Sequence, residues 1–210
     1  MTRTAGVVLA GGQATRMGRN KAFLKVGGQP LIERVVTRLA PLVSRVIIVA
    51  NDPGPLRYLG LDIIPDAVPA GGAPAGLLAG LQHAGQPVLA VACDLPFISA
   101  ALGMYLMDNL PGWDAVVPRC PEGLQPLFAV YGRTCVEPLR KSVGRGERRL
   151  TGFYPGLALR YVEGSELAPF EPDRAFLNIN TEADLAKARR MAQSELLYSN
   201  SRAYNGEDGL

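Results

Sequence analysis

Short, continuous runs of apolar residues alternate with helical patterns through the first half of the chain. The runs are rich in β-branched residues and lack polar alternation, which is typical of strands covered on both faces of a sheet. They lie at 5–10, 44–50, 60–66 and 87–93. Segments with helical periodicity follow them at 30–42, 76–84 and 99–110. Strands that alternate with helices predict crossover connections and a mostly parallel sheet with helices on both faces.

Local signals support two of these helices. Pro30 suits the first helical position of the 30–42 segment, and Leu31, Val35 and Leu39 recur at a spacing that forms one core-facing stripe. Ser99 is predicted as the N-cap of the 99–110 helix, because its hydroxyl can accept a hydrogen bond from the first turn.

The second half of the chain is less regular. Strands are predicted at 114–118, 125–131 and 158–164, and helices at 135–143, 147–154 and 180–196. Thr181 and Asp184 have the spacing of a capping box at the start of the last helix. We find no internal repeat and no linker, which predicts one domain over 1–197. The alternation of strands and helices predicts that this domain is a three-layer α/β/α sandwich with a mostly parallel, Rossmann-like sheet. The polar segment 198–210 is expected to be a frayed, flexible tail.

Composition and charge exclude several classes of protein. The 210 residues are 48% hydrophobic and 20% charged, as in globular domains, and a net charge of +3 with mixed signs disfavours nucleic-acid binding. No apolar stretch approaches the roughly 20 residues of a membrane helix, and the apolar run at the N-terminus is too short for a signal peptide. Three cysteines without metal-ligand spacing suit a reducing cytoplasm, and His83 is predicted to lie on the surface.

Polar side chains follow each of the first four predicted strands. They are the loop Gly11–Lys21, then Asn51, Asp66 and Asp94. Because ligands bind at the carboxyl ends of parallel strands, we expect these residues to converge on one edge of the sheet.

The loop "GGQATRMGRNK" after the first strand is rich in glycine and positive charge. Glycines let backbone N–H groups approach a ligand, while Arg16 and Lys21 can bind phosphate oxygens. The loop matches neither the Walker A motif nor the dinucleotide fingerprint. A tight turn with solvated charges is the alternative interpretation.

The two carboxylates and the amide have both functional and structural interpretations. Asp94, at the end of a buried strand, is suited to Mg²⁺ or to capping the next helix, whereas Asp66 and Asn51 can contact a nucleotide or only form turns. Together with Lys21 and Arg16, the two aspartates form a frame for metal-assisted attack on phosphorus. Such chemistry depends mainly on positioning and charge neutralisation, so it needs no Ser–His or Cys–His pair.

These residues resemble the signature of the nucleotidyltransferases that are similar to sugar-nucleotide pyrophosphorylases. Within that superfamily, the chain most resembles the molybdenum cofactor guanylyltransferases, over about 5–190. The resemblance rests on "LAGG" (9–12), "RMGRNK" (16–21), Asn51, Asp66, "CDLPF" (93–97), "QPLFAVY" (125–131), "GERRL" (146–150) and "NINTEADL" (178–185).

The resemblance implies that the terminal phosphate of molybdopterin attacks the α-phosphorus of Mg²⁺-bound GTP and that pyrophosphate leaves. It implies a GTP-binding half over about 1–110 and an acceptor-binding half over about 111–197. The nucleotide-binding residues that it implies are Leu9, Ala10, Gly11, Gly12, Lys21, Asn51, Asp66 and Asp94, with Asp94 as the metal ligand. Arg16, Lys21 and Asp94 are the implied catalytic residues, and Asn178 and Asn180 are placed near the acceptor. Molybdoenzymes or their chaperones are the implied protein partners.

Two positions depart from the family pattern, and three alternatives stay open. Asn20 stands where the family usually has Asp, and Ala73 replaces a glycine in the loop after Asp66, so Gly71, Gly72 and Gly76 receive no precise role. The second glycine of "LAGG" favours a purine, but a cytidylyltransferase, a sugar-phosphate nucleotidyltransferase and a non-catalytic adaptor remain possible. The basic segment 140–149 is interpreted as a site for the pterin phosphate, a surface for an acidic acceptor enzyme, or a solvated helix end.

Overall fold

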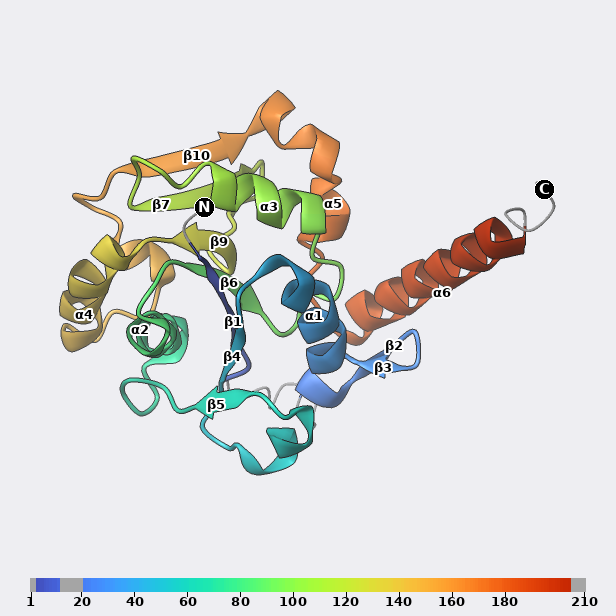
Figure 1. The fold of residues 1–210 in the computed structure, drawn as a ribbon, viewed down its shortest axis with the longest axis horizontal. Helices are drawn as coiled ribbons and strands as arrows, with labels where there is room; N and C mark the ends of the chain where they lie inside the picture. The colour runs from blue at the N-terminus through green and yellow to red at the C-terminus, as the bar shows by residue number, and fades with distance from the viewer. Residues whose placement is uncertain (1–2, 12–20, 205–210) are drawn as a thin grey trace.

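A mixed sheet forms the centre of the computed structural model, which describes residues 3–11 and 21–204 (Figure 1). Its strand order is β10-β7-β9-β6-β1-β4-β5, with β8 paired to β7. The strands are β1 (Ala5–Leu9), β4 (Val46–Val49), β5 (Asp62–Ile64), β6 (Val88–Ala92), β7 (Ala115–Cys120), β8 (Gly123–Leu124), β9 (Phe128–Tyr131) and β10 (Leu159–Glu163). Both halves of the chain contribute strands to this one sheet.

The sheet is mostly parallel, as predicted. β1 pairs in parallel with β4 and β6, with Val7 opposite Ile47 and Ala90, and β10 pairs in parallel with β7. β9 runs antiparallel to both β6 and β7. β9 follows β7 after a short connection, and such a connection suits an antiparallel neighbour, whereas a parallel one needs a long crossover.

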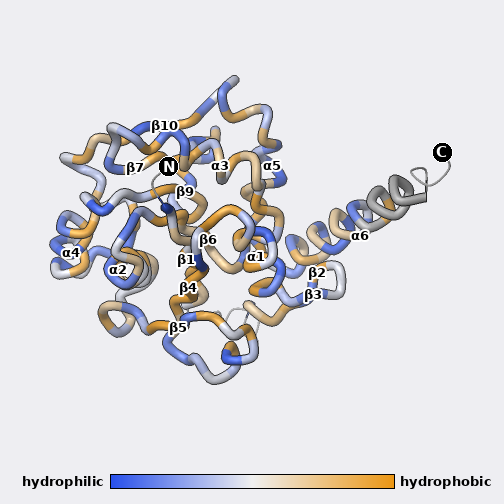
Figure 2. The backbone as a smooth tube through the Cα atoms, in the orientation of Figure 1, coloured by the Kyte–Doolittle hydropathy of each residue, from blue (hydrophilic) through white to orange (hydrophobic). Residues whose placement is uncertain are grey.

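Helices cover both faces of the sheet. The helices are α1 (Leu31–Leu39), α2 (Gly72–Ala84), α3 (Ala100–Asp108), α4 (Val136–Gly144), α5 (Pro172–Ala175) and α6 (Glu182–Tyr204). α2 and α4 pack on the face that carries Val7 and Ile47, whereas α1 and α3 pack on the face that carries Val8 and Ile48. The apolar strands between these layers form the core (Figure 2). This arrangement is the predicted three-layer sandwich.

A third apolar cluster seats the start of α6 beside the sheet. Phe97, Ile179 and Leu185 pack there with Val26 of a small hairpin. The hairpin joins β2 (Lys25–Val26) to β3 (Gln29–Pro30) and was not predicted. Its turn consists of two glycines with positive φ, a two-residue connection that matches strand twist. The later part of α6 extends away from the body (Figure 1).

Two predicted helices are wrong in extent and one is wrong in type. α2 begins at Gly72, because Pro74 is tolerated in a first turn whose N–H groups have no helical partner. α6 continues to Tyr204, beyond the predicted end at 196 and into the segment 198–210; residues 205–210 lie outside the described part. The 147–154 segment contains only a 3₁₀ turn, since the Glu147 carboxylate accepts hydrogen bonds from the backbone N–H groups of Arg148 and Arg149.

Short 3₁₀ helices form several connections. They lie at Lys21–Phe23, Gly54–Leu59, Ala40–Leu42, Arg133–Cys135, Leu150–Phe153, Gly164–Glu166 and Ala168–Phe170.

The predicted caps are present: Ser99 accepts a hydrogen bond from Leu102 N at 3.3 Å, and Thr181 Oγ1 accepts one from Asp184 N at 3.1 Å. Pro30 precedes α1 by one residue and is not its first residue. Among the helices of the described ranges, none is long and apolar enough to cross a membrane.

Candidate active site

A cavity of about 230 Å³ opens at the carboxyl ends of β1 and β6. Seven of the predicted site residues line it: Leu9, Ala10, Gly11, Lys21, Asp66, Asp94 and Asn178. A second cavity of about 580 Å³ adjoins it and shares Ala10, Gly11 and Asp66, while Asn51 lines only the second. The structure thus brings together the residues that follow the first four predicted strands.

Asn51 holds Asp66 through two hydrogen bonds. Asn51 Nδ2 donates to Asp66 Oδ2 at 2.9 Å, and Asn51 Oδ1 accepts from the backbone N–H of Asp66 at 3.0 Å. Because Asn51 follows β4 and Asp66 follows β5, this pair joins the ends of two neighbouring strands. Asn51 therefore holds Asp66, whose side chain lines both cavities.

Two glycines make room for the Asp66 carboxylate. A Cβ on Gly76 would lie 3.1 Å from both Asp66 Oδ1 and Leu9 Cδ2, and a Cβ on Gly11 would lie 3.5 Å from Asp66 Oδ1. Gly76 and Gly72, in the first turns of α2, line the cavity. The sequence alone gave these glycines no role, since the loop before α2 departs from the family pattern.

Lys21 links Asp94, the candidate metal ligand, to Asn180, which lies between α5 and α6. Its Nζ lies 3.7 Å from Asp94 Oδ2 and donates to Asn180 Oδ1 at 2.8 Å. The side chains of Lys21 and Asp94 are only 15% and 19% exposed. Burial raises the pKa of the Asp94 carboxyl, and the positive charge of Lys21 offsets only part of that rise. Asp94 is not the cap of α3, because Ser99 fills that position.

The predicted acceptor-binding asparagines lie beside Asp94. Ile179 N donates to Asp94 O at 3.1 Å, which fixes the 178–180 segment against the end of β6. Asn178 Oδ1 is buried without a hydrogen-bond partner among the described residues, and Asn178 lines the cavity with Asp94. A buried acceptor in a cavity wall is suited to a ligand N–H or O–H group.

The described part of the site provides two carboxylates for a cation. Asp94 and Asp66 both line the smaller cavity, and the described ranges contain no group of three or more His, Cys, Asp or Glu residues that could by itself hold a metal ion. One or two carboxylates suit a Mg²⁺ ion whose other ligands are water and substrate phosphates. The residues present therefore fit a cation that arrives with a nucleotide.

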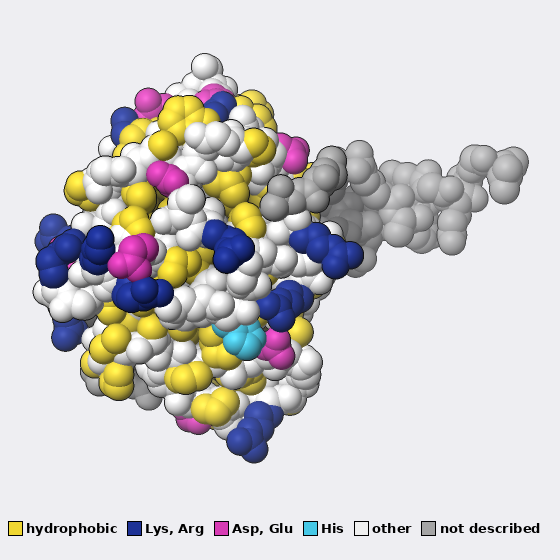
Figure 3. Space-filling model, turned by 60° about the vertical axis from the view of Figure 1, so that its left-hand side comes forward, with side chains coloured by type: hydrophobic (Ala, Val, Ile, Leu, Met, Phe, Trp, Pro, Cys, Tyr) yellow, Lys and Arg dark blue, Asp and Glu magenta, His cyan; other side chains and the backbone are white. Residues whose placement is uncertain are grey.

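Arg148 was not predicted individually as a site residue, although it lies in "GERRL" (146–150). It lines the larger cavity with Asn51 and Asp66 and belongs to the basic segment 140–149, which contains five basic residues and one acidic residue. Figure 3 shows Lys and Arg side chains gathered at one side of the molecule. His83 is exposed, as predicted. The basic segment was visible in the sequence, but the placing of Arg148 depends on how the chain returns past α2.

Two predicted site residues, Gly12 and Arg16, lie outside the described residues. Their assignments stay predictions, as does any effect of Asn20, which stands where the family usually has Asp. Lys21, at the other end of the same loop, is described and lies in the cavity wall.

Comparison with known proteins places the chain in a family. Residues 6–158 match the model of the MobA-like NTP transferase domain. A probable molybdenum cofactor guanylyltransferase from Pelotomaculum thermopropionicum is 41% identical, over 92% of this chain and 96% of that protein. A molybdenum cofactor guanylyltransferase from Desulfosudis oleivorans is 35% identical, over 90% of this chain and 95% of that protein.

A solved structure agrees with these relatives. The crystal structure of molybdopterin-guanine dinucleotide biosynthesis protein A from Archaeoglobus fulgidus is similar with a TM-score of 0.80 and 26% identity. The match covers 91% of this chain and 100% of that one. The family model, the relatives and this fold agree, so the chain belongs to the molybdenum cofactor guanylyltransferase family of MobA-like NTP transferases.

Proposed function

We propose that the chain transfers GMP from GTP to the terminal phosphate of molybdopterin, forming the guanine dinucleotide cofactor and releasing pyrophosphate. The observation that carries the proposal is the cavity that Lys21, Asp66 and Asp94 line together. The names and high coverage of the relatives support the choice of substrates.

The reaction exchanges one phosphorus–oxygen bond for another. An oxygen of the acceptor phosphate attacks the α-phosphorus of GTP, a bond forms between them, and the bond to the β-phosphate oxygen breaks. The β- and γ-phosphates leave together as pyrophosphate, and no enzyme nucleophile is required. Positioning and charge neutralisation supply most of the catalysis in such transfers.

The chain's residues divide between the two substrates in this proposal. Leu9, Ala10 and Gly11 contact the nucleotide, and Asp66, held by Asn51, accepts hydrogen bonds from it. Lys21 binds a phosphate oxygen as a point charge, with Arg16 as a second cation. Asn178 and Asn180 contact the acceptor from the other side of Asp94. Residues 1–110 thus serve mainly GTP and residues 111–197 mainly the pterin.

Asp94 would hold Mg²⁺ in the complex with GTP. When bound, this ion neutralises phosphate charge and favours departure of pyrophosphate. Burial of Asp94 suits that role, because a desolvated carboxylate gains more from a cation than a hydrated one does. Lys21 Nζ at 3.7 Å balances the Asp94 charge before the nucleotide arrives.

GTP is the proposed nucleotide because "LAGG" has a second glycine, and the one methyl group that it lacks leaves room beside a purine. The same loop can host CTP, which would make the enzyme a cytidylyltransferase. The choice is decided by the nucleotide comparison that closes the Discussion.

The basic segment 140–149 is proposed to receive the pterin phosphate through Arg148 and to face the molybdoenzyme or chaperone that accepts the product. The three cysteines are free, which suits the reducing cytoplasm in which we propose that the reaction occurs.

Label transfer tests the proposed bond exchange. GTP labelled at the α-phosphorus should transfer its label to molybdopterin in the presence of Mg²⁺, and GTP labelled at the γ-phosphorus should release its label only as pyrophosphate. Release of the γ-label as inorganic phosphate, with no label on the pterin, would instead indicate hydrolysis and would overturn the proposal.

A further inference from the structure

Three arginines surround Phe97, three residues after Asp94. Phe97 is 2% exposed, and the guanidinium carbons of Arg34, Arg38 and Arg174 lie 4.9, 5.8 and 5.4 Å from its ring centroid. Phe97 therefore fixes the far end of the Asp94–Phe97 segment by apolar burial and by cation–π contact.

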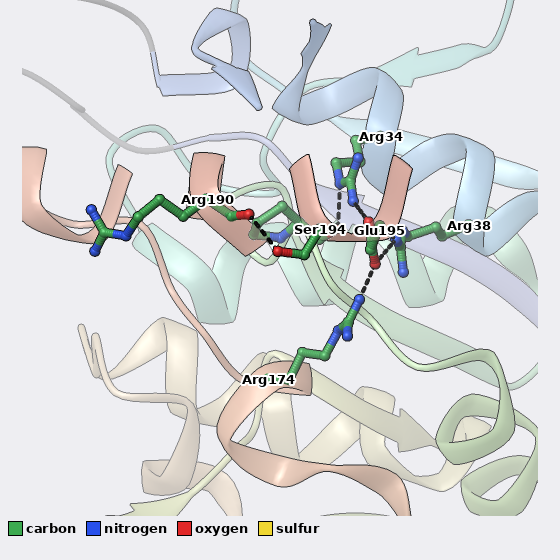
Figure 4. Close-up of polar contacts among 7 residues, drawn as sticks. Arg34, Arg38, Arg174, Arg190, Ser194 and Glu195 are labelled. Carbon is green, nitrogen blue, oxygen red and sulfur yellow. Dashed lines mark hydrogen bonds and ion pairs between the residues drawn. The ribbon is translucent and has the colours of Figure 1, made fainter. Parts of the chain in front are cut away.

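Glu195 of α6 binds all three guanidinium groups (Figure 4). Arg38 Nη2 donates to its two carboxylate oxygens at 2.8 and 3.0 Å, and Arg34 and Arg174 form ion pairs with the same carboxylate. Arg34 and Arg38 come from α1 and Arg174 comes from α5, so Glu195 joins three helices at one point.

Arg34 differs from the other two arginines. Its Nε donates to the carbonyl oxygen of Pro96 at 3.0 Å, directly within the segment that carries Asp94. Its side chain is 11% exposed, against 31% for Arg38 and 35% for Arg174. The Nε of the guanidinium thus holds the backbone at Pro96, while its Nη2 binds Glu195.

The Asp94 segment is also held from its other side. Ile179 N donates to Asp94 O at 3.1 Å, and Leu95 N donates to Ala92 O at 3.3 Å. Arg34 supplies the side-chain contact to Pro96, two residues beyond Asp94. A shift of this backbone would move the Asp94 carboxylate relative to Lys21 and the cavity.

We propose that Arg34 is a positioning residue that sets the Asp94 carboxylate for the cation and nucleotide, with Glu195 holding Arg34 in place. The inference rests on the proposed function, because it assigns Asp94 its role in the transfer. A purely structural role for Arg34 would join α1 to α6 without any effect on the chemistry, so the two roles predict different kinetics.

Arg34→Lys and Arg38→Lys form a matched pair for the test. Both keep a positive charge near Glu195 and Phe97, but lysine cannot bind Pro96 and Glu195 at once as the guanidinium fork does. Arg34→Lys should lower kcat about 10- to 100-fold and raise the Mg²⁺ concentration for half-maximal rate, because small displacements of a reacting group have effects of that size. Arg38→Lys should leave both values within about twofold of wild type. Equal effects of the two variants, or unchanged kcat and Mg²⁺ dependence in Arg34→Lys, would overturn the proposal.

Backbone amide exchange gives a readout that does not depend on activity. In full-length Arg34→Lys, the peptide that contains Leu95 and Phe97 should exchange faster than in wild type and in Arg38→Lys, while peptides from β1 and β4 remain protected. If Arg34→Lys does not fold, Glu195→Gln serves instead, since it loosens Arg34 and keeps the donor to Pro96. Unchanged exchange in this peptide refutes positioning by Arg34. If the variant exchanges faster but the wild-type chain has no transferase activity, only the proposed function is refuted.

Discussion

Asn51 and Asp66 exchange two hydrogen bonds, 2.9 and 3.0 Å long, across the ends of β4 and β5. Asn51→Ala removes both bonds and leaves the Asp66 side chain free to turn away from the cavities. We expect the KM for GTP to rise about tenfold, consistent with about 1.5 kcal/mol for a lost charge-assisted hydrogen bond. The matched control is Asn109→Ala, which removes a side-chain bond to Tyr105 O at the end of α3 and alters neither cavity lining. An unchanged KM in steady-state assays of Asn51→Ala would show that Asp66 does not need this support.

Asp94→Asn separates activity from stability. Removing the charge should lower kcat by at least about 100-fold, as expected when a main electrostatic contact with the reacting phosphates is lost. Thermal unfolding at neutral pH should nevertheless occur at a higher temperature than in wild type, because burial raises the pKa of Asp94 and so disfavours its charged form.

The sign of this stability effect can be followed with pH. When the pKa of a carboxyl is higher in the folded than in the unfolded chain, the protein loses stability as the pH rises through the pKa of the folded state. The difference in melting temperature between Asp94→Asn and wild type should therefore be largest above the pKa of Asp94 and shrink in acid. The wild-type rate should fall over the same acid range, as protonated Asp94 loses its affinity for a cation. A variant less stable than wild type at neutral pH would contradict the burial effect.

Lys21→Ala should weaken binding of the triphosphate. Lys21 is largely buried beside Asp94 and Asn180, so its loss removes one cation from the phosphates and leaves Asp94 without its neighbouring charge. We expect kcat/KM for GTP to fall about 10- to 100-fold, from about 1.5–3 kcal/mol for a hydrogen bond to a charged group. Lys25→Ala, at the exposed residue of β2, is the control for charge removal. If calorimetry shows the same GTP affinity for Lys21→Ala and wild type, Lys21 is not a phosphate ligand.

Gly80→Ala tests the close packing of α2 on β1. A Cβ at this position would lie 2.6 Å from Val7 Cγ1, so either the helix or the strand must shift. We expect the free energy of unfolding to fall by about 1–3 kcal/mol, the usual effect of overpacking a core. At Gly144, the last residue of α4, an added Cβ meets no described atom within 4 Å. Gly144→Ala should therefore be neutral or slightly stabilising in urea unfolding, and equal losses in both variants would refute the packing argument.

Much of the site could be predicted because it depends on a general property of parallel sheets. Asn51, Asp66 and Asp94 follow apolar strands, and the ends of those strands must meet at one edge whatever the rest of the chain does. The direction of β9 and the loss of helix at 147–154 depend instead on the connection that follows β7 and on the Glu147 side chain. A pattern of hydrophobic residues contains neither kind of information.

Contacts between distant residues account for what the sequence could not reveal. Arg34 and Glu195 are 161 positions apart, and nothing in the periodicity of α1 or α6 predicts that they meet beside Phe97. Arg148 reaches the larger cavity only because the chain passes the start of α2 after leaving α4. Residue types suggested charge in both places, but only the packed fold decides which charges face the site.

The most direct test of the account is pterin-dependent pyrophosphate release by the purified chain with Mg²⁺ and molybdopterin, comparing GTP, CTP and ATP at equal concentration. The account predicts release with GTP that requires the pterin and is at least tenfold slower with CTP or ATP. Release that favours CTP would contradict the assigned nucleotide, and the absence of pterin-dependent release with every nucleotide would contradict the transfer itself.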